Sequence, residues 1–363
     1  MERVVVTKRG ADRLRAGHPW IYRSDLLSVT EGIESGDAVV VVDDRGRIQG
    51  TAFHGAQSQI ALRFVSREVV EVDEAFLRAR LSAALALRER IFPGVTALRL
   101  VHGEADLLPG LVVDRYGDAL SIQTGIPATD RRKETICDLL QELTKVETIV
   151  ERNDGRTRLL EGLQQTKGVL RGTYQGPSAY REGDAILAVD LLEGQKTGAF
   201  LDQRENHLRA GAYASGRSLD LFSYAGGFAL QMSQAADSVK AVEISESACE
   251  AIRANAERSG RGNVEVICAN VFDWLRDELS AGARYDSIVL DPPAFAKNKA
   301  AVPAAMRGYK EVNLRALQLL APGGTLLTFT CSYHVAPDAF EALVMDAARD
   351  ARRDVQVLER LGA

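Results

Sequence analysis

The fold of this chain is decided by the stretch Ser218-Leu-Asp-Leu-Phe-Ser-Tyr-Ala-Gly-Gly-Phe228. Its first half is an apolar run typical of a short parallel strand covered on both faces, and Asp220 interrupts that run near the carboxyl end. Gly226 and Gly227 follow, and they let the backbone approach a ligand that a side chain would obstruct. Nucleotide-like ligands bind at such turns in doubly wound α/β sheets, so the stretch predicts a ligand site. A strand and a helix joined by a flexible turn is the alternative.

Length and composition are those of a soluble globular protein. The 363 residues predict two or three domains, and 46% are hydrophobic and 26% charged. The sequence has no apolar run of transmembrane length and no signal-peptide core, so we expect a cytoplasmic protein that does not contact membranes. The net charge of -5 does not favour bulk binding to nucleic acid but leaves room for a local basic patch. Spacing argues against a disulfide framework and against a metal site for the four cysteines, Cys137, Cys249, Cys268 and Cys331.

The N-terminal region combines basic and aromatic residues. Residues 1–24 carry six basic side chains against two acidic ones and lead into Gly17-His-Pro-Trp-Ile-Tyr22. Three β-like runs at 37–42, 46–53 and 59–64 then predict a small β-barrel over residues 1–72. Basic side chains beside aromatic rings are typical of RNA contact through phosphates and stacking. The candidates are Arg13, Arg15, His18 and Trp20, with a place in the barrel core as an equal alternative for Trp20.

The middle region, residues 73–180, is expected to form an α+β domain. Helical spacing begins around residues 71–90, and a second helix fits 130–143. Strand-like runs lie at 111–113, 119–124 and 148–151. No residues here have the spacing of a catalytic site, so we interpret the region as a platform between the two end domains.

Residues 181–363 show a regular alternation of strands and helices, which predicts a doubly wound parallel sheet. Acidic or amide residues follow four successive strands: Asp220, Glu243, Asn270 and Asp291. Glu243, about twenty residues beyond the turn, suits a ribose diol, and Asn270 suits an adenine edge. The glycine pattern lacks the third glycine of GxGxxG, which argues against a dinucleotide.

These motifs resemble the signatures of class I S-adenosylmethionine-dependent RNA methyltransferases. The chain is most similar to the bacterial ribosomal RNA large-subunit methyltransferase I family, which makes 5-methylcytidine in 23S rRNA. Beyond the glycine turn, the resemblance rests on Asp291-Pro-Pro-Ala-Phe295, Thr330-Cys-Ser332, Arg13-Leu-Arg-Ala-Gly-His-Pro-Trp-Ile21 and Gly194-Gln-Lys-Thr-Gly198. It implies a Rossmann-like methyltransferase sheet preceded by a PUA-like RNA-binding barrel. The implied partner is 23S rRNA or a large-subunit ribosomal particle, and a homodimer is one option for the oligomeric state.

The resemblance also assigns residues to S-adenosylmethionine. Glu243 is implied to bind the ribose hydroxyls and Asn270 the adenine, although related families more often have Asp at the latter position. Asp202 and Arg204 are implied as polar contacts from a lid over residues 196–206. The residues implied to border the methionine part are Asp220, Phe222, Ser223, Tyr224, Ala225, Gly226 and Gly227, with Asp291 beside them.

Cytosine C5 is a poor nucleophile, and attack of a thiolate on C6 makes it reactive. Position and resemblance together favour Cys331 as that thiolate over a buried hydrophobe, with Asp291 as the partner of the protonated base edge. His334 is close enough in sequence to influence the thiol's pKa. Phe295 is interpreted as a stacking platform for a flipped base or as a core residue. Lys297 and Lys299 are interpreted as phosphate contacts or as a solvated face.

Two features depart from the family pattern. A second cysteine is absent after Asp291-Pro292, so product release requires a base that the sequence does not identify. A strand predicted at 355–359 is followed by only four residues, so we expect a C-terminal truncation relative to the family. Three other functions stay open. They are a nitrogen-directed RNA methyltransferase in which Cys331 is dispensable, a non-catalytic RNA-binding ribosome assembly factor and, least favoured, a nicotinamide-dependent dehydrogenase.

Overall fold

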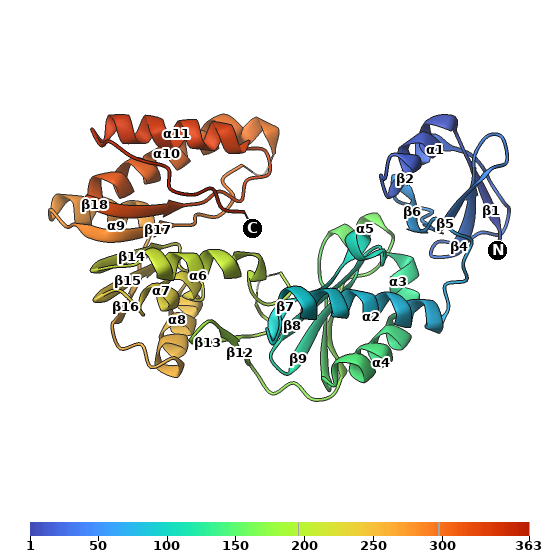
Figure 1. Ribbon diagram of the computed structural model, residues 1–363, viewed down its shortest axis with the longest axis horizontal. Helices are drawn as coiled ribbons and strands as arrows, with labels where there is room; N and C mark the ends of the chain where they lie inside the picture. The colour runs from blue at the N-terminus through green and yellow to red at the C-terminus, as the bar shows by residue number, and fades with distance from the viewer. Residues whose placement is uncertain (195, 297, 363) are drawn as a thin grey trace. The chain divides into compact units, whose positions relative to one another are not determined.

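The computed structural model describes residues 1–194, 196–296 and 298–362. The chain divides into two compact units, which are drawn in Figure 1. The first contains Met1–Tyr180 and Val189–Ala199, and the second contains Arg181–Ala188 and Phe200–Ala363. None of the helices in the described part of the chain combines the length and the apolar character needed to cross a bilayer.

The first unit begins with a six-stranded sheet of order β2-β6-β5-β4-β1-β3. The predicted β-like runs form β4, β5 and β6, whereas the other three strands are only three or four residues long and too short for a clear period. One face of the sheet buries Val4, Val6, Val39 and Val41 against α1. The elements are β1 (Arg3–Val6), α1 (Lys8–Arg15), β2 (Trp20–Tyr22), β3 (Leu26–Val29), β4 (Ala38–Val42), β5 (Ile48–His54) and β6 (Ile60–Ser66).

A five-stranded sheet of order β11-β10-β9-β8-β7 follows in the same unit. Two helices pack on it, with Leu77, Leu81, Ile136 and Leu140 in the shared core. The strands are β7 (Ala97–His102), β8 (Leu111–Tyr116), β9 (Ala119–Thr124), β10 (Thr148–Asn153) and β11 (Thr166–Arg171). The helices are α2 (Glu74–Ile91), α3 (Pro127–Arg131), α4 (Lys133–Thr144) and α5 (Thr157–Leu160). The predicted α+β character of this region is confirmed.

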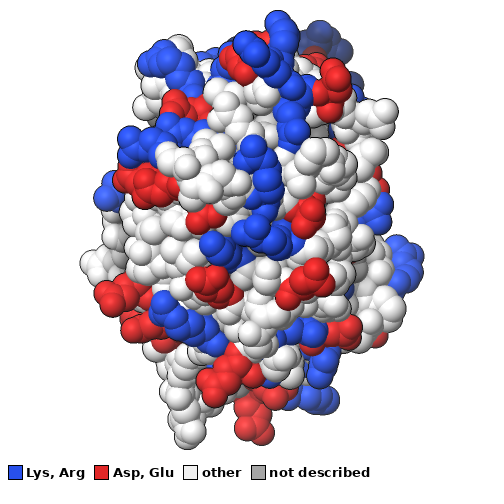
Figure 2. Space-filling model, turned by 90° about the vertical axis from the view of Figure 1, so that its left-hand side faces the viewer, with Lys and Arg blue, Asp and Glu red and all other residues white. Residues whose placement is uncertain are grey.

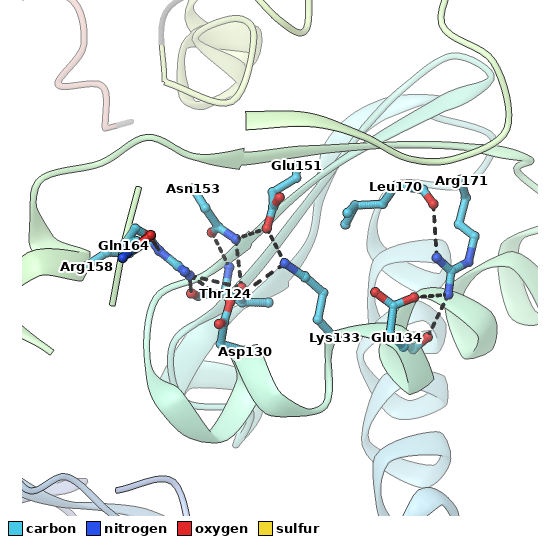
Figure 3. A network of polar contacts seen from close by, with 10 residues as sticks. All are labelled: Thr124, Asp130, Lys133, Glu134, Glu151, Asn153, Arg158, Gln164, Leu170 and Arg171. Atoms are coloured by element: carbon cyan, nitrogen blue, oxygen red, sulfur yellow. Dashed lines mark hydrogen bonds and ion pairs between the residues drawn. The ribbon is translucent and has the colours of Figure 1, made fainter. Parts of the chain in front are cut away.

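A polar network joins β9, β10 and the short helices of this region (Figure 3). The buried Thr124 hydroxyl donates to Asp130 at 2.8 Å and accepts from Asn153 Nδ2 at 2.8 Å. Arg158 binds the same Asp130 at 2.9 Å, and Lys133 pairs with Glu151 at 2.5 Å. Two carboxylates and two cations therefore balance one another in a buried position, which gives this network a structural role.

The second unit is built on a parallel sheet of order β16-β15-β14-β17-β18, as the doubly wound prediction requires. Leu219 and Leu221 pack with α9 and α10 on one face, whereas Ala241 and Val289 pack with α6, α7 and α8 on the other. The strands are β14 (Arg217–Leu221), β15 (Ser238–Glu243), β16 (Val264–Cys268), β17 (Tyr285–Leu290) and β18 (Leu320–Thr328). The helices are α6 (Arg204–Tyr213), α7 (Gly227–Met232), α8 (Glu246–Arg258), α9 (Val271–Ser280), α10 (Val302–Leu319) and α11 (Pro337–Asp350).

The segment before this sheet starts with the two-stranded sheet β12 (Ser178–Glu182) and β13 (Ala185–Val189). The chain then returns to the first unit, where Thr197 donates to Asp114 Oδ2 at 2.5 Å and Ala199 N donates to the Tyr116 hydroxyl at 3.0 Å. The second unit resumes at Phe200. Only the later part of the predicted lid over 196–206 therefore belongs to the unit that carries the parallel sheet.

The predicted strand at 355–359 is wrong. These residues form no regular secondary structure, and the side chains of Val355, Val357 and Leu358 are exposed. Ion pairs fix the segment instead, because Glu359 pairs with Arg209 of α6 and Arg360 pairs with Glu341 of α11. An alternation of valines predicted a strand, but the charged residues that follow them bind helices.

Candidate active site

The glycine turn after β14 has an unusual backbone. Phe222 and Tyr224 have left-handed φ values of 65° and 49°, which is uncommon for bulky residues, and Gly226 follows at 84°. Such conformations cost on the order of 1–3 kcal/mol each and cluster at ligand sites. The turn is held by Asp220 Oδ2, which accepts from the Ser223 hydroxyl at 2.5 Å and from Ala229 N at 3.0 Å.

Asp220 is fully buried beneath the turn. Its Oδ1 atom has no hydrogen-bond partner among the described residues. Burial raises the pKa of this carboxyl to about 6, against the lowering effect of the Ser223 hydrogen bond. A buried acceptor without a partner favours a ligand that brings a hydrogen-bond donor, and the ammonium group of S-adenosylmethionine is such a donor. The turn therefore fits the cofactor implied by the sequence.

The raised pKa of Asp220 makes a prediction about stability. Below pH 3.8 the carboxyl is protonated in both states, whereas between pH 3.8 and about 6 only the folded state keeps the proton. The free energy of unfolding should therefore fall by about 3 kcal/mol as pH rises through this window. Asp220→Asn should remove that dependence in urea titrations from about pH 4 to about pH 7. Ser223→Ala should extend the window to higher pH, because it removes a hydrogen bond that lowers the folded pKa, and an unchanged slope in Asp220→Asn would contradict the assignment.

His207 of α6 lies directly beneath the turn, and the sequence analysis did not identify it. Its Nδ1 atom is 2.7 Å from Glu182 Oε1, and its ring packs edge-on against Phe228 with centroids 4.4 Å apart. Burial lowers the pKa of His207, but the charges of Glu182, Asp220 and Asp291 together raise it above its ordinary value. The raised pKa favours the protonated imidazole, and Asp220 and Asp291 are two of the predicted site carboxylates that raise it.

The ring of His207 also explains Gly227. A Cβ atom on Gly227 would lie 2.3–2.7 Å from three atoms of the imidazole. Since Glu182 and Phe228 hold the ring, Gly227→Ala should lower the free energy of unfolding by about 2–3 kcal/mol. Gly262→Ala is a matched control in the same unit, because its Cβ would meet nothing within 4 Å. Chemical denaturation of both variants measures the difference, and equal stabilities would refute this explanation.

Glu243 ends β15, the neighbour of β14 in the sheet. Its carboxylate accepts hydrogen bonds from Tyr224 N at 3.0 Å, from Ile244 N at 2.8 Å and from Ser245 N at 2.9 Å. It is half-buried, and it connects the end of its own strand to the glycine turn. The structure thus brings Glu243 to the turn that was predicted to border the cofactor.

Asn270 follows β16, the next strand outward. It is exposed and caps α9, because Oδ1 accepts from Phe272 N at 2.9 Å. The cap uses one lone pair of Oδ1. The second lone pair of Oδ1 and the Nδ2 amide group are therefore the atoms of Asn270 that could contact adenine.

Cys331 and Asp291 lie at the carboxyl ends of adjacent strands. Leu290 of β17 pairs with Thr328 of β18, and Phe329 N donates to Leu290 O at 2.9 Å. The Cys331 thiol is exposed and lies 3.8 Å from the carbonyl oxygen of Pro292, the residue after Asp291. The strand pairing thus brings Cys331 to the backbone of the Asp291–Pro292 segment at the carboxyl end of the sheet.

A buried pair of hydroxyls fixes this neighbourhood. Ser332 Oγ accepts from Ala296 N at 3.1 Å and is 2.8 Å from the Tyr309 hydroxyl. Phe295 packs on Tyr309 with ring centroids 4.6 Å apart and belongs to an apolar cluster, which favours its core role. Ser332 and Tyr309 were missed because no motif links them, although Ser332 directly follows Cys331.

The other predicted site residues of the second unit are mostly exposed or bound to neighbouring side chains. Asp202 is exposed, Arg204 pairs with Glu205, and Phe200 packs edge-on against Tyr224 of the turn at 5.1 Å. Lys299 is exposed, and Lys297 lies outside the described residues. His334 packs against Tyr333, whose side chain is 94% exposed. Tyr333 is a fourth residue that the sequence analysis missed, since only exposure distinguishes it from a core aromatic.

The RNA-contact candidates of the first unit are partly engaged in the fold. Arg13 pairs with the buried Asp25 at 2.5 Å, and Arg15 pairs with Asp12 at 2.5 Å and with Asp43 at 3.1 Å. His18 Nδ1 accepts from Trp20 N at 3.1 Å. Trp20 donates its indole N–H to Glu104 at 2.8 Å, which connects β2 to the middle region. The indole of Trp20 therefore takes part in a hydrogen bond within the fold and is also a candidate for RNA contact.

Charge is mixed on the face drawn in Figure 2, where basic and acidic side chains are interspersed. This agrees with the net charge of -5. An RNA contact on this face would therefore rest on local groups of basic residues rather than on a field of one sign.

Family comparisons identify both ends of the chain. Residues 4–67 match a PUA-like domain, and residues 179–363 match the S-adenosylmethionine-dependent methyltransferase family. By fold, the chain is similar to a protein of Streptococcus mutans described as a SAM-dependent methyltransferase, with a TM-score of 0.76, 19% identity and coverage of 96% of this chain and 90% of that one. A structure of SMU.776 complexed with SAH gives a TM-score of 0.78 at 20% identity, with the same coverage of both chains.

Curated relatives are similar over nearly the whole length. A ribosomal RNA large subunit methyltransferase I of Shewanella amazonensis is 40% identical, with coverage of 95% of this chain and 89% of the relative. The protein of the same name from Photobacterium profundum is 36% identical, with coverage of 99% and 93%. The predicted cofactor is confirmed as S-adenosylmethionine. The chain belongs to the ribosomal RNA large subunit methyltransferase I family, whose members are S-adenosylmethionine-dependent methyltransferases.

Proposed function

We propose that this protein methylates C5 of a cytosine in 23S rRNA, through a covalent adduct between Cys331 and C6 of the base. The observation that carries the proposal is the position of the Cys331 thiol, exposed and 3.8 Å from Pro292 O beside Asp291. A nucleophile and a carboxyl group at the ends of adjacent strands are the parts that the reaction needs. The names of the relatives, which specify large-subunit ribosomal RNA, support the substrate class.

The donor contributes an electrophilic methyl group, and this chain's residues do the rest. The Cys331 thiolate forms a bond to C6, the electron pair of the C5–C6 double bond moves toward C5, and Asp291 hydrogen-bonds to the protonated N3 edge. C5 then forms a bond to the donor's methyl group as the methyl–sulfur bond breaks, and S-adenosylhomocysteine is the product that leaves. Loss of the C5 proton to a base expels the thiolate and restores the ring. The rigid backbone at Pro292 and the hydrogen-bonded pair Ser332–Tyr309 are proposed to hold Cys331 and Asp291 at a fixed separation.

We further propose a division of labour along the chain. Residues 1–72 bind RNA through a surface that includes Arg13, Arg15, His18 and Trp20. Residues 73–180 connect the two end domains, and residues 181–363 bind the methyl donor and perform the reaction. The match of residues 4–67 to a PUA-like domain supports the first assignment. Phe295, Lys297 and Lys299 are proposed to flank the target nucleotide. Asp202 and Arg204 are proposed to contact the donor with Asp220–Gly227, Glu243 and Asn270.

The test is a methyl-transfer assay with labelled S-adenosylmethionine, in which 23S rRNA and intact large subunits from cells lacking the gene are offered separately. Digestion to nucleosides and mass spectrometry should find 5-methylcytidine, and sequence mapping should place it at one position. A methyl group on a ring or exocyclic nitrogen would refute the C5 assignment and support the nitrogen-directed alternative. No transfer to either substrate, despite donor binding, would refute the enzymatic proposal in favour of an assembly factor.

A further inference from the structure

Two cysteines outside the proposed catalytic edge lie together beside Glu243. Cys249 is in the first turns of α8 and is fully buried, whereas Cys268 ends β16 and is exposed. The Cys249 thiol donates to Glu243 O at 3.5 Å, and the Cys268 thiol donates to Ile244 O at 3.7 Å. The two thiols thus bind the carbonyl groups of consecutive residues.

The strand pairing also places these two cysteines near one another. Cys268 is the register partner of Glu243 in the parallel pairing of β15 with β16. Cys249 and Cys268 are close enough to influence one another, since burial together with the neighbouring Cys268 thiol raises the pKa of Cys249 to about 11. A disulfide requires sulfur atoms about 2.05 Å apart, so two thiols that both bind the backbone at Glu243 and Ile244 need only a short movement to form one.

We propose that Cys249 and Cys268 form a reversible disulfide that weakens binding of the methyl donor. The oxidant is a low-molecular-weight disulfide such as oxidised glutathione. The exposed Cys268 thiolate attacks one sulfur of this disulfide, which forms a mixed disulfide and releases one glutathione thiolate. The Cys249 thiolate then attacks the Cys268 sulfur, which forms the protein disulfide and releases the second. The two protein thiols lose two protons and two electrons, and oxidised glutathione gains them to become two molecules of glutathione thiol.

The consequence for the donor follows from the hydrogen bonds that the reaction removes. Oxidation eliminates both S–H donors, so the carbonyls of Glu243 and Ile244 lose these contacts. The Glu243 carboxylate is held by the amides of Ile244 and Ser245, and a shift of this backbone moves it. This step rests on the proposed role of Glu243 in binding the donor ribose. We expect the dissociation constant of the donor to rise roughly tenfold on oxidation, a coupling of the usual size between two sites.

The experiment uses the full chain in glutathione buffers of increasing oxidised-to-reduced ratio. After the free thiols are blocked, tryptic digestion without reduction should release residues 241–253 linked to residues 262–276, which contain Cys249 and Cys268 respectively. Calorimetry with S-adenosylhomocysteine on the same samples should show the loss of affinity, and dithiothreitol should reverse it. By thermodynamic linkage, saturating S-adenosylhomocysteine should raise the oxidised-to-reduced glutathione ratio needed to form the disulfide, roughly tenfold.

Two variants serve as controls. Cys268→Ser should bind S-adenosylhomocysteine with the same affinity in oxidising and reducing buffer, whereas Cys331→Ser should still respond to oxidation. Absence of the linked peptide pair at any glutathione ratio would overturn the disulfide. A linked pair without a change in affinity beyond about twofold would overturn its effect on the donor. If the reduced protein bound no S-adenosylhomocysteine, both the proposed donor site and the proposed effect of oxidation on donor affinity would be refuted. The linked peptide pair would then be the only test of the disulfide.

Discussion

Replacement of Cys331 by alanine is expected to abolish methyl transfer while leaving the binding of S-adenosylmethionine unchanged. The thiol lies at the edge formed by β17 and β18, beside Pro292, whereas the turn that is proposed to bind the donor follows β14. Without the thiolate, C5 of cytosine keeps its low reactivity. Loss of a covalent nucleophile typically lowers kcat by on the order of 10⁴-fold or more.

The assay compares single-turnover transfer to 23S rRNA with donor affinity from calorimetry. Cys268→Ser is the matched control under reducing conditions, since it removes another exposed thiol at the end of a strand of the same sheet. It should retain transfer. Full transfer by Cys331→Ala would refute the covalent mechanism and leave the donor site intact as a separate conclusion.

Glu243→Ala is expected to produce the largest loss of donor affinity. The carboxylate organises three backbone amides at the end of β15 and is proposed to accept from the two ribose hydroxyls. Hydrogen bonds to a charged group contribute about 1.5–3 kcal/mol each, so losing them should raise the dissociation constant roughly 100-fold.

Calorimetric titration with S-adenosylmethionine measures this effect. Glu265→Ala is the matched control, because Glu265 is an exposed glutamate on the adjacent strand β16 and pairs in register with Lys240. The dissociation constant of the Glu265→Ala variant for S-adenosylmethionine should stay at the wild-type value. Glu243→Gln should fall between the two, since its amide oxygen still accepts. Wild-type affinity in Glu243→Ala would exclude this residue from the donor site.

Much of the fold could be predicted from local pattern. The strands at β14 to β17 and the helices after them follow from apolar runs and helical spacing, because each pattern is complete within one segment. Three short strands, β1, β2 and β3, were missed because three or four residues carry too little period. The strand predicted at 355–359 failed for the converse reason, since alternating valines do not reveal that Glu359 and Arg360 pair with helices.

The candidate site divides in the same way. The sequence predicted that Asp220, Glu243, Asn270 and Asp291 lie at or just beyond the ends of successive strands, and parallel strands bring their carboxyl ends to one edge. His207, Tyr309, Ser332 and Tyr333 were not identified. Their roles depend on which helix or loop packs behind the turn or beside the strand end, and no spacing in the sequence encodes that.

The sequence by itself determined the order of the strands and helices in the second unit, the glycine turn after Asp220 and the identity of the residues that follow each strand. Only the tertiary structure decided which of these residues meet. It placed Cys331 against Pro292, the ring of His207 under Gly227 and the thiols of Cys249 and Cys268 on the carbonyl groups of Glu243 and Ile244. The physical reason is that secondary structure follows from neighbours in the chain. Reactivity, pKa and redox pairing follow instead from distances of a few ångströms between segments that only packing brings together.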